Sequence, residues 1–249
     1  MDRISLVGII YMVKRFFKFG LKIMPMRWGQ LIVGVYGMVK LPTFSYSQKG
    51  EDILIDCFFN RRKNGYYLDI GCFHPRWISN TYLLHKRGWI GTGVDLEEHK
   101  LSFYKKIRGK KVNVIQAAVV GEKGSDEPLC FYKFDSAFGW SDVDTLDKTK
   151  ADEWAKKHSK TYSVRNVKSL NINDLLINLP QVDFLNIDIE GLDLEVVGAI
   201  DFDQFKIRAI LFEDTFNTRE YEKLLPKLTS YGYRRLFNAG NSICFVLED

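Results

Sequence analysis

Short apolar runs alternate with segments of helical periodicity from residue 44 to the end of the chain. Runs of four to eight apolar residues between turn residues predict strands. These runs lie at 66–70, 89–95, 111–120, 182–188 and 207–213, with an extra one at 128–134. The segments between them predict helices over 51–65, 79–87, 97–107, 174–176, 191–199 and 218–231, and a charged helix around 147–158. Strands that alternate with helices in this way indicate an α/β domain with a mostly parallel sheet.

Candidate chemistry is concentrated where the first two predicted strands end. The first ends at Asp69 and Gly71, and the second ends at Asp95, followed by Leu96. A glycine there lets the backbone approach a ligand, and an acid after the second strand can accept hydrogen bonds from a ribose. A dinucleotide site has three glycines around a pyrophosphate, whereas Gly71 stands alone. The pattern favours S-adenosylmethionine, and the alternative is a tight turn that binds no ligand.

The last two predicted strands, 233–238 and 242–248, are joined by the short segment Asn238–Asn241. Two strands joined so closely must be antiparallel, because a parallel pair needs a crossover of a dozen or more residues. A mostly parallel sheet of seven strands that ends in an antiparallel hairpin is the Rossmann-like layout of class I methyltransferases. A plain dinucleotide dehydrogenase domain does not end in this way.

The third predicted strand ends near Gln116 and Ala117. At this position a side-chain amide can both donate to and accept from an adenine ring. We therefore predict that these two residues contact the cofactor, although Gln116 is equally compatible with a place on the surface.

A second group of polar residues follows the fourth and fifth strands. Asp188 and Glu190 come after the fourth strand, where we expect both to face the cofactor, and Glu213 and Asp214 end the fifth. Carboxylates on neighbouring strand ends repel one another unless a divalent cation such as Mg²⁺, basic side chains or substrate donors neutralise them. We predict a metal site at Asp188, Glu213 and Asp214. The alternative for the last two is solvation at a helix start, where acids are favoured.

His74 follows the glycine turn and is one of four histidines in the chain. It is a candidate general base for a hydroxyl acceptor. The alternative is a partly buried histidine that shapes the loop.

Charge divides the chain into two parts. Residues 1–40 carry a net charge of +6, and the remaining residues carry −1. The near-neutral body argues against a nucleic-acid partner. The arm, residues 1–43, is predicted either to lie as a basic amphipathic helix on a membrane surface or to pack on the domain or a second subunit. Residues 44–249 form the catalytic domain, with a polar insertion at 135–165 that is typical of a lid or binding loop.

Four stretches of the domain resemble the FkbM-type S-adenosylmethionine-dependent methyltransferases. They are SQKGEDILI (47–55), YYLDIGCFHPRWISNTYLLHKRGWIGTGVDLEE (66–98), NVIQAAVVGEKG (113–124) and VDFLNIDIEGLDLEVVGAI (182–200). The resemblance implies a class I methyltransferase fold and O-methylation, often of a sugar hydroxyl. Near the cofactor it implicates Gln48, Glu51, Asp69, Gly71, Asn80, Asp95 and Asp188. Cys72, which we also expect at the cofactor, stands where many relatives have alanine.

Together these patterns predict a methyltransferase that acts on a sugar hydroxyl of a surface glycan or its nucleotide-linked precursor. The scattered cysteines, none with C-x-x-C spacing, fit a reducing compartment, so we expect the cytoplasmic side, with the arm on the inner face of the membrane. Asp188 and His74 are the candidate catalytic residues. Two rival functions are a nicotinamide-dependent oxidoreductase and a methyltransferase-like scaffold that has lost catalysis.

Overall fold

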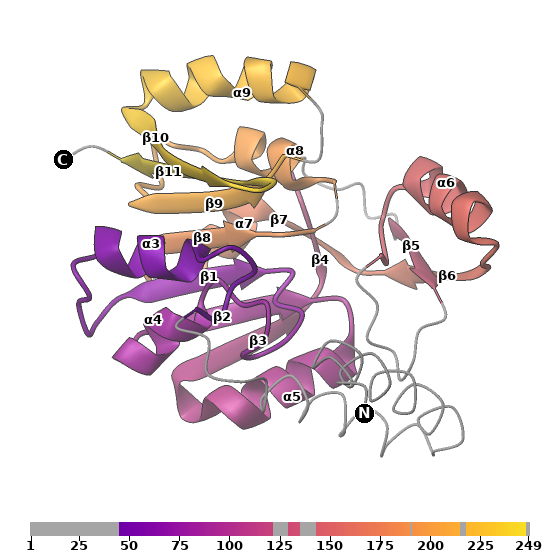
Figure 1. Cartoon of the computed structure of the whole chain (residues 1–249), viewed down its shortest axis with the longest axis horizontal. Helices are drawn as coiled ribbons and strands as arrows, with labels where there is room; N and C mark the ends of the chain where they lie inside the picture. The colour runs from indigo at the N-terminus through magenta and orange to yellow at the C-terminus, as the bar shows by residue number, and fades with distance from the viewer. Residues whose placement is uncertain (1–44, 122–128, 135–142, 190, 215–217, 248–249) are drawn as a thin grey trace, which may run out of the picture.

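A seven-stranded mixed sheet forms the centre of the molecule in the computed structural model, which describes residues 45–121, 129–134, 143–189, 191–214 and 218–247 (Figure 1). The strand order is β10-β11-β9-β8-β1-β2-β3. The bounds are β1 (Tyr66–Ile70), β2 (Ile90–Asp95), β3 (Val112–Gln116), β8 (Phe184–Ile187), β9 (Ala209–Glu213), β10 (Tyr233–Ala239) and β11 (Ser242–Leu247). Only β11 runs against its neighbours in this sheet. The predicted class I methyltransferase layout, with its terminal antiparallel hairpin, is confirmed.

Three helices pack on each face of the sheet. One face carries α3 (Glu51–Phe58), α4 (Tyr82–Arg87) and α5 (Glu98–Arg108), which ends in a short 3₁₀ turn; the other carries α7 (Ile172–Ile177), α8 (Asp193–Ala199) and α9 (Thr218–Ser230). Successive strand residues point to opposite faces, so Tyr67 packs under the first set of helices and Leu68 under the second. Both are fully buried, as expected for a central parallel strand.

The run predicted as one strand over 111–120 is two strands in the structure. β3 ends at Gln116, and β4 (Ala118–Val120) leaves the main sheet to pair in parallel with β7 (Ser169–Asn171). The ladder changes partner at this point: Ala117 N–H donates to Asp95 O at 3.3 Å, and Ala118 N–H donates to Lys168 O at 2.9 Å. The break leaves open space beside the carboxyl end of β2.

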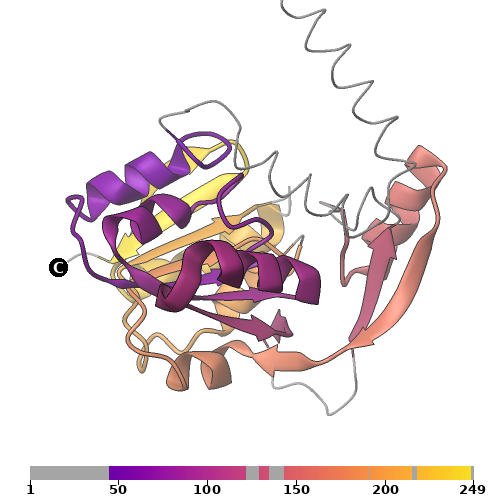
Figure 2. The same ribbon diagram turned by 90° about the horizontal axis from the view of Figure 1, so that it is seen from below.

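A smaller unit projects beside the main sheet, and we call it the appendage (residues 129–134 and 143–167). It consists of β5 (Leu129–Phe134), α6 (Lys148–His158) and β6 (Tyr162–Val167), and Figures 1 and 2 both show it to one side of the sheet. β5 and β6 pair antiparallel, and Tyr132, Phe134 and Ala151 form a small core under α6. The extra strand and the charged helix are confirmed as predicted, whereas β6 and β7 are not predicted by the sequence pattern.

The N-terminal arm, residues 1–43, lies outside the described residues. Within the part of the chain that the structure describes, no helix has the length and apolar character needed to cross a membrane.

Candidate cofactor-binding site

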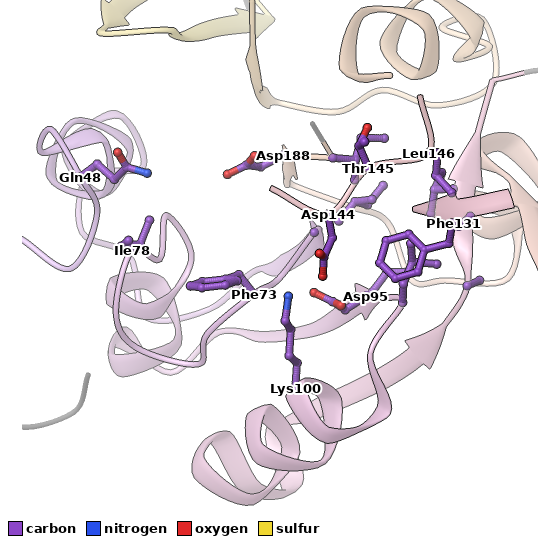
Figure 3. A pocket seen from close by; sticks show the side chains of 18 residues that line it. Gln48, Phe73, Ile78, Asp95, Lys100, Phe131, Asp144, Thr145, Leu146 and Asp188 are labelled. Carbon is purple, nitrogen blue, oxygen red and sulfur yellow. The ribbon is translucent and has the colours of Figure 1, made fainter. Parts of the chain in front are cut away.

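A cavity lies at the carboxyl ends of the central strands, where ligands bind in open α/β sheets. Its walls come from β1, β2, β8, the β4 segment and the appendage (Figure 3). It has an empty volume of about 980 Å³, which includes its open mouth. Its lining residues are Gln48, Ile70, Gly71, Phe73, Ile78, Val94, Asp95, Leu96, Lys100, Ala117, Ala118, Val119, Phe131, Asp144, Thr145, Leu146, Asp188 and Ile189. The cavity therefore includes six of the predicted site residues: Gln48, Gly71, Asp95, Leu96, Ala117 and Asp188.

Gly71 holds two strand ends together at the cavity wall. Its φ is +79°, and a Cβ there would collide with the backbone oxygen of Asp188. Its N–H donates to Val94 O at 2.9 Å. The close contact between the loops after β1 and β8 therefore requires a glycine at this position, whether or not a ligand also approaches it.

Asp95 stands half-buried at the end of β2 and lines the cavity. Its Oδ1 accepts the N–H of Glu97 at 3.0 Å, which fixes the carboxylate at the turn. The cavity also contains Lys100, which the sequence analysis missed. Its side chain is 5% exposed and points toward the carboxylates of Asp95 and Asp144 in Figure 3.

One part of the cavity wall near Asp95 is apolar. Leu96 and Ala117 line it from the sheet, and Phe131 and Leu146 line it from the appendage. Gln116 does not line the cavity: it is exposed, and its Nε2 donates to Leu96 O at 3.0 Å. Gln116 therefore occupies the surface place that the sequence left open, and its contact with adenine stays a prediction.

Asp69 lies beneath the cavity and does not line it. It is 3% exposed, and its carboxylate accepts three hydrogen bonds, from Thr81 Oγ1 at 2.5 Å, Tyr104 OH at 2.6 Å and Asn186 Nδ2 at 2.9 Å. Burial raises the pKa of Tyr104 well above its usual range, so its hydroxyl remains a donor. Three protein donors hold the Asp69 carboxylate, so the structure gives it a supporting role, and its contact with the cofactor stays a prediction.

Arg108 supplies the positive charge that this buried acid needs. It is 3% exposed and donates to Thr81 Oγ1 at 2.8 Å, Ser79 Oγ at 2.7 Å and Pro75 O at 2.9 Å. Its guanidinium carbon lies 4.1 Å from the centre of the Tyr104 ring. Because Thr81 and Tyr104 touch both charged groups, Asp69 and Arg108 form one network that holds the 71–81 loop against the sheet. Arg108 is not among the predicted site residues, because nothing in the helix pattern marks its side chain as buried.

Three other predicted cofactor residues also lie near the cavity without lining it. Asn80 Nδ2 donates to Asn186 Oδ1 at 2.9 Å. Glu51 is 2% exposed, and its Oε2 accepts the N–H of Lys49 at 2.7 Å. Cys72 is buried, and burial, followed by the nearby Asp95 and Asp69 charges, raises the pKa of its thiol well above the usual value. None of the three lines the cavity.

His74 is enclosed by its own loop. It is 1% exposed, and its Nδ1 accepts the backbone N–H of Trp77 at 2.8 Å and of Arg76 at 3.2 Å. The ring does not line the cavity. Burial and the two backbone donors favour the loop-shaping alternative, and the role of His74 as a general base stays a prediction.

The predicted metal site is not supported. Asp188 lines the cavity, but the carboxylates that act on Glu213 are those of Asp193 and Glu51. Burial, then these two charges, raises the pKa of Glu213, and Asp214 N–H donates to Asn241 O at 2.9 Å. In the described ranges no three His, Cys, Asp or Glu side chains are grouped as metal ligands. The predicted cofactor residue Glu190 lies outside these ranges.

The sequence profile of the methyltransferase FkbM domain matches residues 57–235. A comparison with curated proteins gives no match. Among solved structures, the chain is similar to a TehB-like SAM-dependent methyltransferase from Corynebacterium glutamicum, with 12% identity, coverage of 80% of this chain and 88% of that one, and a TM-score of 0.41. It is also similar to an O-methyltransferase from Bacillus cereus in complex with SAH, with 11% identity, coverage of 91% and 93%, and a TM-score of 0.43. On the strength of the domain match, this chain belongs to the FkbM family of S-adenosylmethionine-dependent methyltransferases.

Proposed function

We propose that the protein transfers the methyl group of S-adenosylmethionine to a sugar hydroxyl of a surface glycan or of its nucleotide-linked precursor. The observation that carries the proposal is the cavity itself. It places a carboxylate, Asp95, beside an apolar compartment at one side and the Gly71–Asp188 contact at the other.

The residues present fit this cofactor. Asp95 is placed to accept hydrogen bonds from a ribose diol, and Leu96, Ala117 and Phe131 offer apolar surface for a flat base. The bound cofactor would supply a methyl group on a positively charged sulfur. The protein's part is then to bind, to orient the acceptor in line with the methyl–sulfur bond and to exclude water.

Asp188 and Gln48 are the polar side chains that support a hydroxylic acceptor. Both line the cavity on the side away from Phe131, and they approach it from opposite walls (Figure 3). A carboxylate accepts from sugar hydroxyls, and an amide both donates and accepts. We assign to Asp188 the role of accepting the hydroxyl proton, because His74 is enclosed in its loop.

Mass spectrometry of the cell-surface glycan with and without the gene tests the acceptor class. We expect one sugar to be about 14 Da lighter when the gene is removed, because methyl transfer replaces a hydroxyl hydrogen with CH₃ and the net gain is one CH₂. An unchanged glycan together with methyl transfer to a different class of molecule would contradict the sugar assignment and leave the family assignment intact.

The membrane proposal concerns the arm. Residues 1–40 carry a charge of +6 with interleaved aromatic residues, and each basic residue near an anionic leaflet contributes about 1 kcal/mol. We propose peripheral attachment to the inner face of the membrane, where lipid-linked glycans are assembled. Deletion of residues 1–40 should release the protein from anionic liposomes, and added salt should weaken binding of the full chain. Aggregation of the truncated protein would instead place the arm in the core or a subunit interface.

A further inference from the structure

Glu97 is the buried centre of a charge cluster whose other members are partly exposed, and we call it the Glu97 cluster (Glu97, His99, Lys133 and Arg165). Glu97 is 5% exposed. Its Oε1 accepts from Lys133 Nζ at 2.9 Å and from Arg165 Nη2, and His99 Nδ1 lies 3.4 Å from Oε2. Burial opposes ionisation of Glu97, but hydrogen bonds from His99 and Lys133 and the Lys133 and Arg165 charges lower its pKa to about 2. Glu97 is therefore a carboxylate at any physiological pH.

The cluster joins the appendage to the turn that carries the predicted ribose acceptor. Lys133 belongs to β5 and Arg165 to β6, whereas Glu97 immediately precedes α5. The backbone N–H of Glu97 is the donor to Asp95 Oδ1. One residue thus positions Asp95 through its backbone and binds the appendage through its side chain.

The appendage in turn provides a wall of the cavity. Phe131 in β5 lines the cavity, and the Arg165 guanidinium carbon lies 5.4 Å from the centre of its ring. Thr145 also lines it and is held to β5 by two backbone hydrogen bonds with Tyr132, at 2.9 and 3.2 Å. Displacement of the appendage would therefore remove the apolar wall opposite the sheet.

The appendage meets the body on the other side of the cavity as well. Lys150 of α6 lies so close to Gly191, in the loop after β8, that a Cβ at Gly191 would collide with the Lys150 ammonium. The appendage consequently contacts the loops after β2 and β8. These two strands lie on either side of β1 in the sheet.

We propose that Glu97 is a positioning residue that docks the appendage over the cofactor cavity, so that cofactor affinity depends on a side chain that does not line the cavity. The proposal rests on the proposed use of this cavity for S-adenosylmethionine. When a binding-competent arrangement is only partly populated, the measured dissociation constant rises in inverse proportion to its population. An appendage docked about one tenth of the time would weaken cofactor binding about tenfold.

Calorimetric titration with S-adenosylhomocysteine tests the proposal on the full chain. We expect E97Q, which keeps the shape of the side chain and removes its charge, to bind about tenfold more weakly than the wild type. The matched control is D56N. Asp56 is also buried, at 3% exposure, and pairs with Arg87 at 2.9 and 2.7 Å between α3 and α4, away from the cavity. The control should lose stability without losing affinity.

A second variant separates docking from folding. The Arg165 side chain is 46% exposed, so R165M should remain folded and still weaken binding several-fold. If Glu97 acts through Arg165, the E97Q/R165M protein should bind little worse than E97Q alone, because contacting residues are not additive. Affinity within twofold of the wild type in folded E97Q and R165M would overturn the proposal, as would an equal loss of affinity in D56N.

Hydrogen exchange distinguishes failure of this inference from failure of the proposed cofactor. Amides of β5 and β6 should exchange faster in E97Q than in D56N, whether or not ligand is bound. A wild-type protein that does not bind S-adenosylhomocysteine contradicts the proposed function, while unchanged exchange at β5 and β6 in E97Q contradicts docking by Glu97.

Discussion

The Asp69–Arg108 network makes a specific prediction about the stability of the domain. The substitution D69N keeps the size of the side chain and removes its charge. Arg108, at 3% exposure, would then be buried without the acid that its charge faces. Thr81, Tyr104 and Asn186 now all donate to Asp69, and an amide can accept from only part of this set.

The expected loss follows from these contacts. Removal of one partner from a buried charge pair typically costs about 3–5 kcal/mol, because the remaining charge is stranded. Asp69 and Arg108 are linked through Thr81 and Tyr104 and form no direct ion pair, so we take this range as the upper limit of the loss. In a domain of this size each kcal/mol lowers the melting temperature by about 2–4 °C. We therefore expect D69N to melt at most roughly 6–20 °C below the wild type.

Scanning calorimetry and urea unfolding of D69N, R108M and D69N/R108M test the reasoning. The double variant should lose less than the sum of the single losses, because neither charge is then stranded. A D69N protein that is less than about 1 kcal/mol destabilised, or losses that add fully, would refute the claim that the two groups compensate each other.

Three further predictions concern single residues. G71A should abolish binding of S-adenosylhomocysteine, because its φ of +79° and the Asp188 backbone leave no room for a Cβ; near-normal affinity would show that the two loops can separate freely. F131A should weaken binding of the same ligand about tenfold by removing a buried aromatic wall, and unchanged affinity would place the adenine base elsewhere. Burial raises the pKa of Glu213 in the folded protein. The folded state is therefore destabilised as the pH rises from the pKa of the unfolded state to that of the folded state and beyond, because the buried carboxyl group must then ionise. E213Q should therefore melt above the wild type at pH 7 and not at pH 4, and equal melting temperatures at pH 7 would count against this.

Much of the fold can be predicted from the sequence because each core element carries its own periodicity. The central strands read as continuous apolar runs since both of their faces are covered. The terminal hairpin follows from the shortness of its connection alone. The break at Ala117 is different: the pattern over 111–120 continues across it, whereas in the structure Ala118 N–H donates to Lys168 O and the strand changes sheets.

The site is predictable in part for the same reason. Gly71, Asp95 and Asp188 lie at strand ends, which a parallel sheet must bring to one edge. Lys100 and Phe131 are missed because their place in the cavity depends on how α5 and the appendage pack, which local patterns do not encode.

Several residues are predicted to act at the site because they lie close to Gly71 in the sequence. Asp69 and Cys72 flank Gly71, yet both point into the protein, where one is held by donors and the other is packed in the core. His74 follows closely and is held by backbone donors of its own turn. A motif locates a functional loop, but only packing decides which of its side chains face the ligand and which hold the loop in place.

The central claim is that this cavity binds S-adenosylmethionine through Asp95, and calorimetric titration with S-adenosylhomocysteine tests it most directly. We expect the wild type to bind and NADH not to compete. Loss of charge-assisted hydrogen bonds to a ribose costs about 1.5–3 kcal/mol, so D95A should bind at least roughly tenfold more weakly. No binding by the folded wild type, or equal affinity in D95A, would contradict the account.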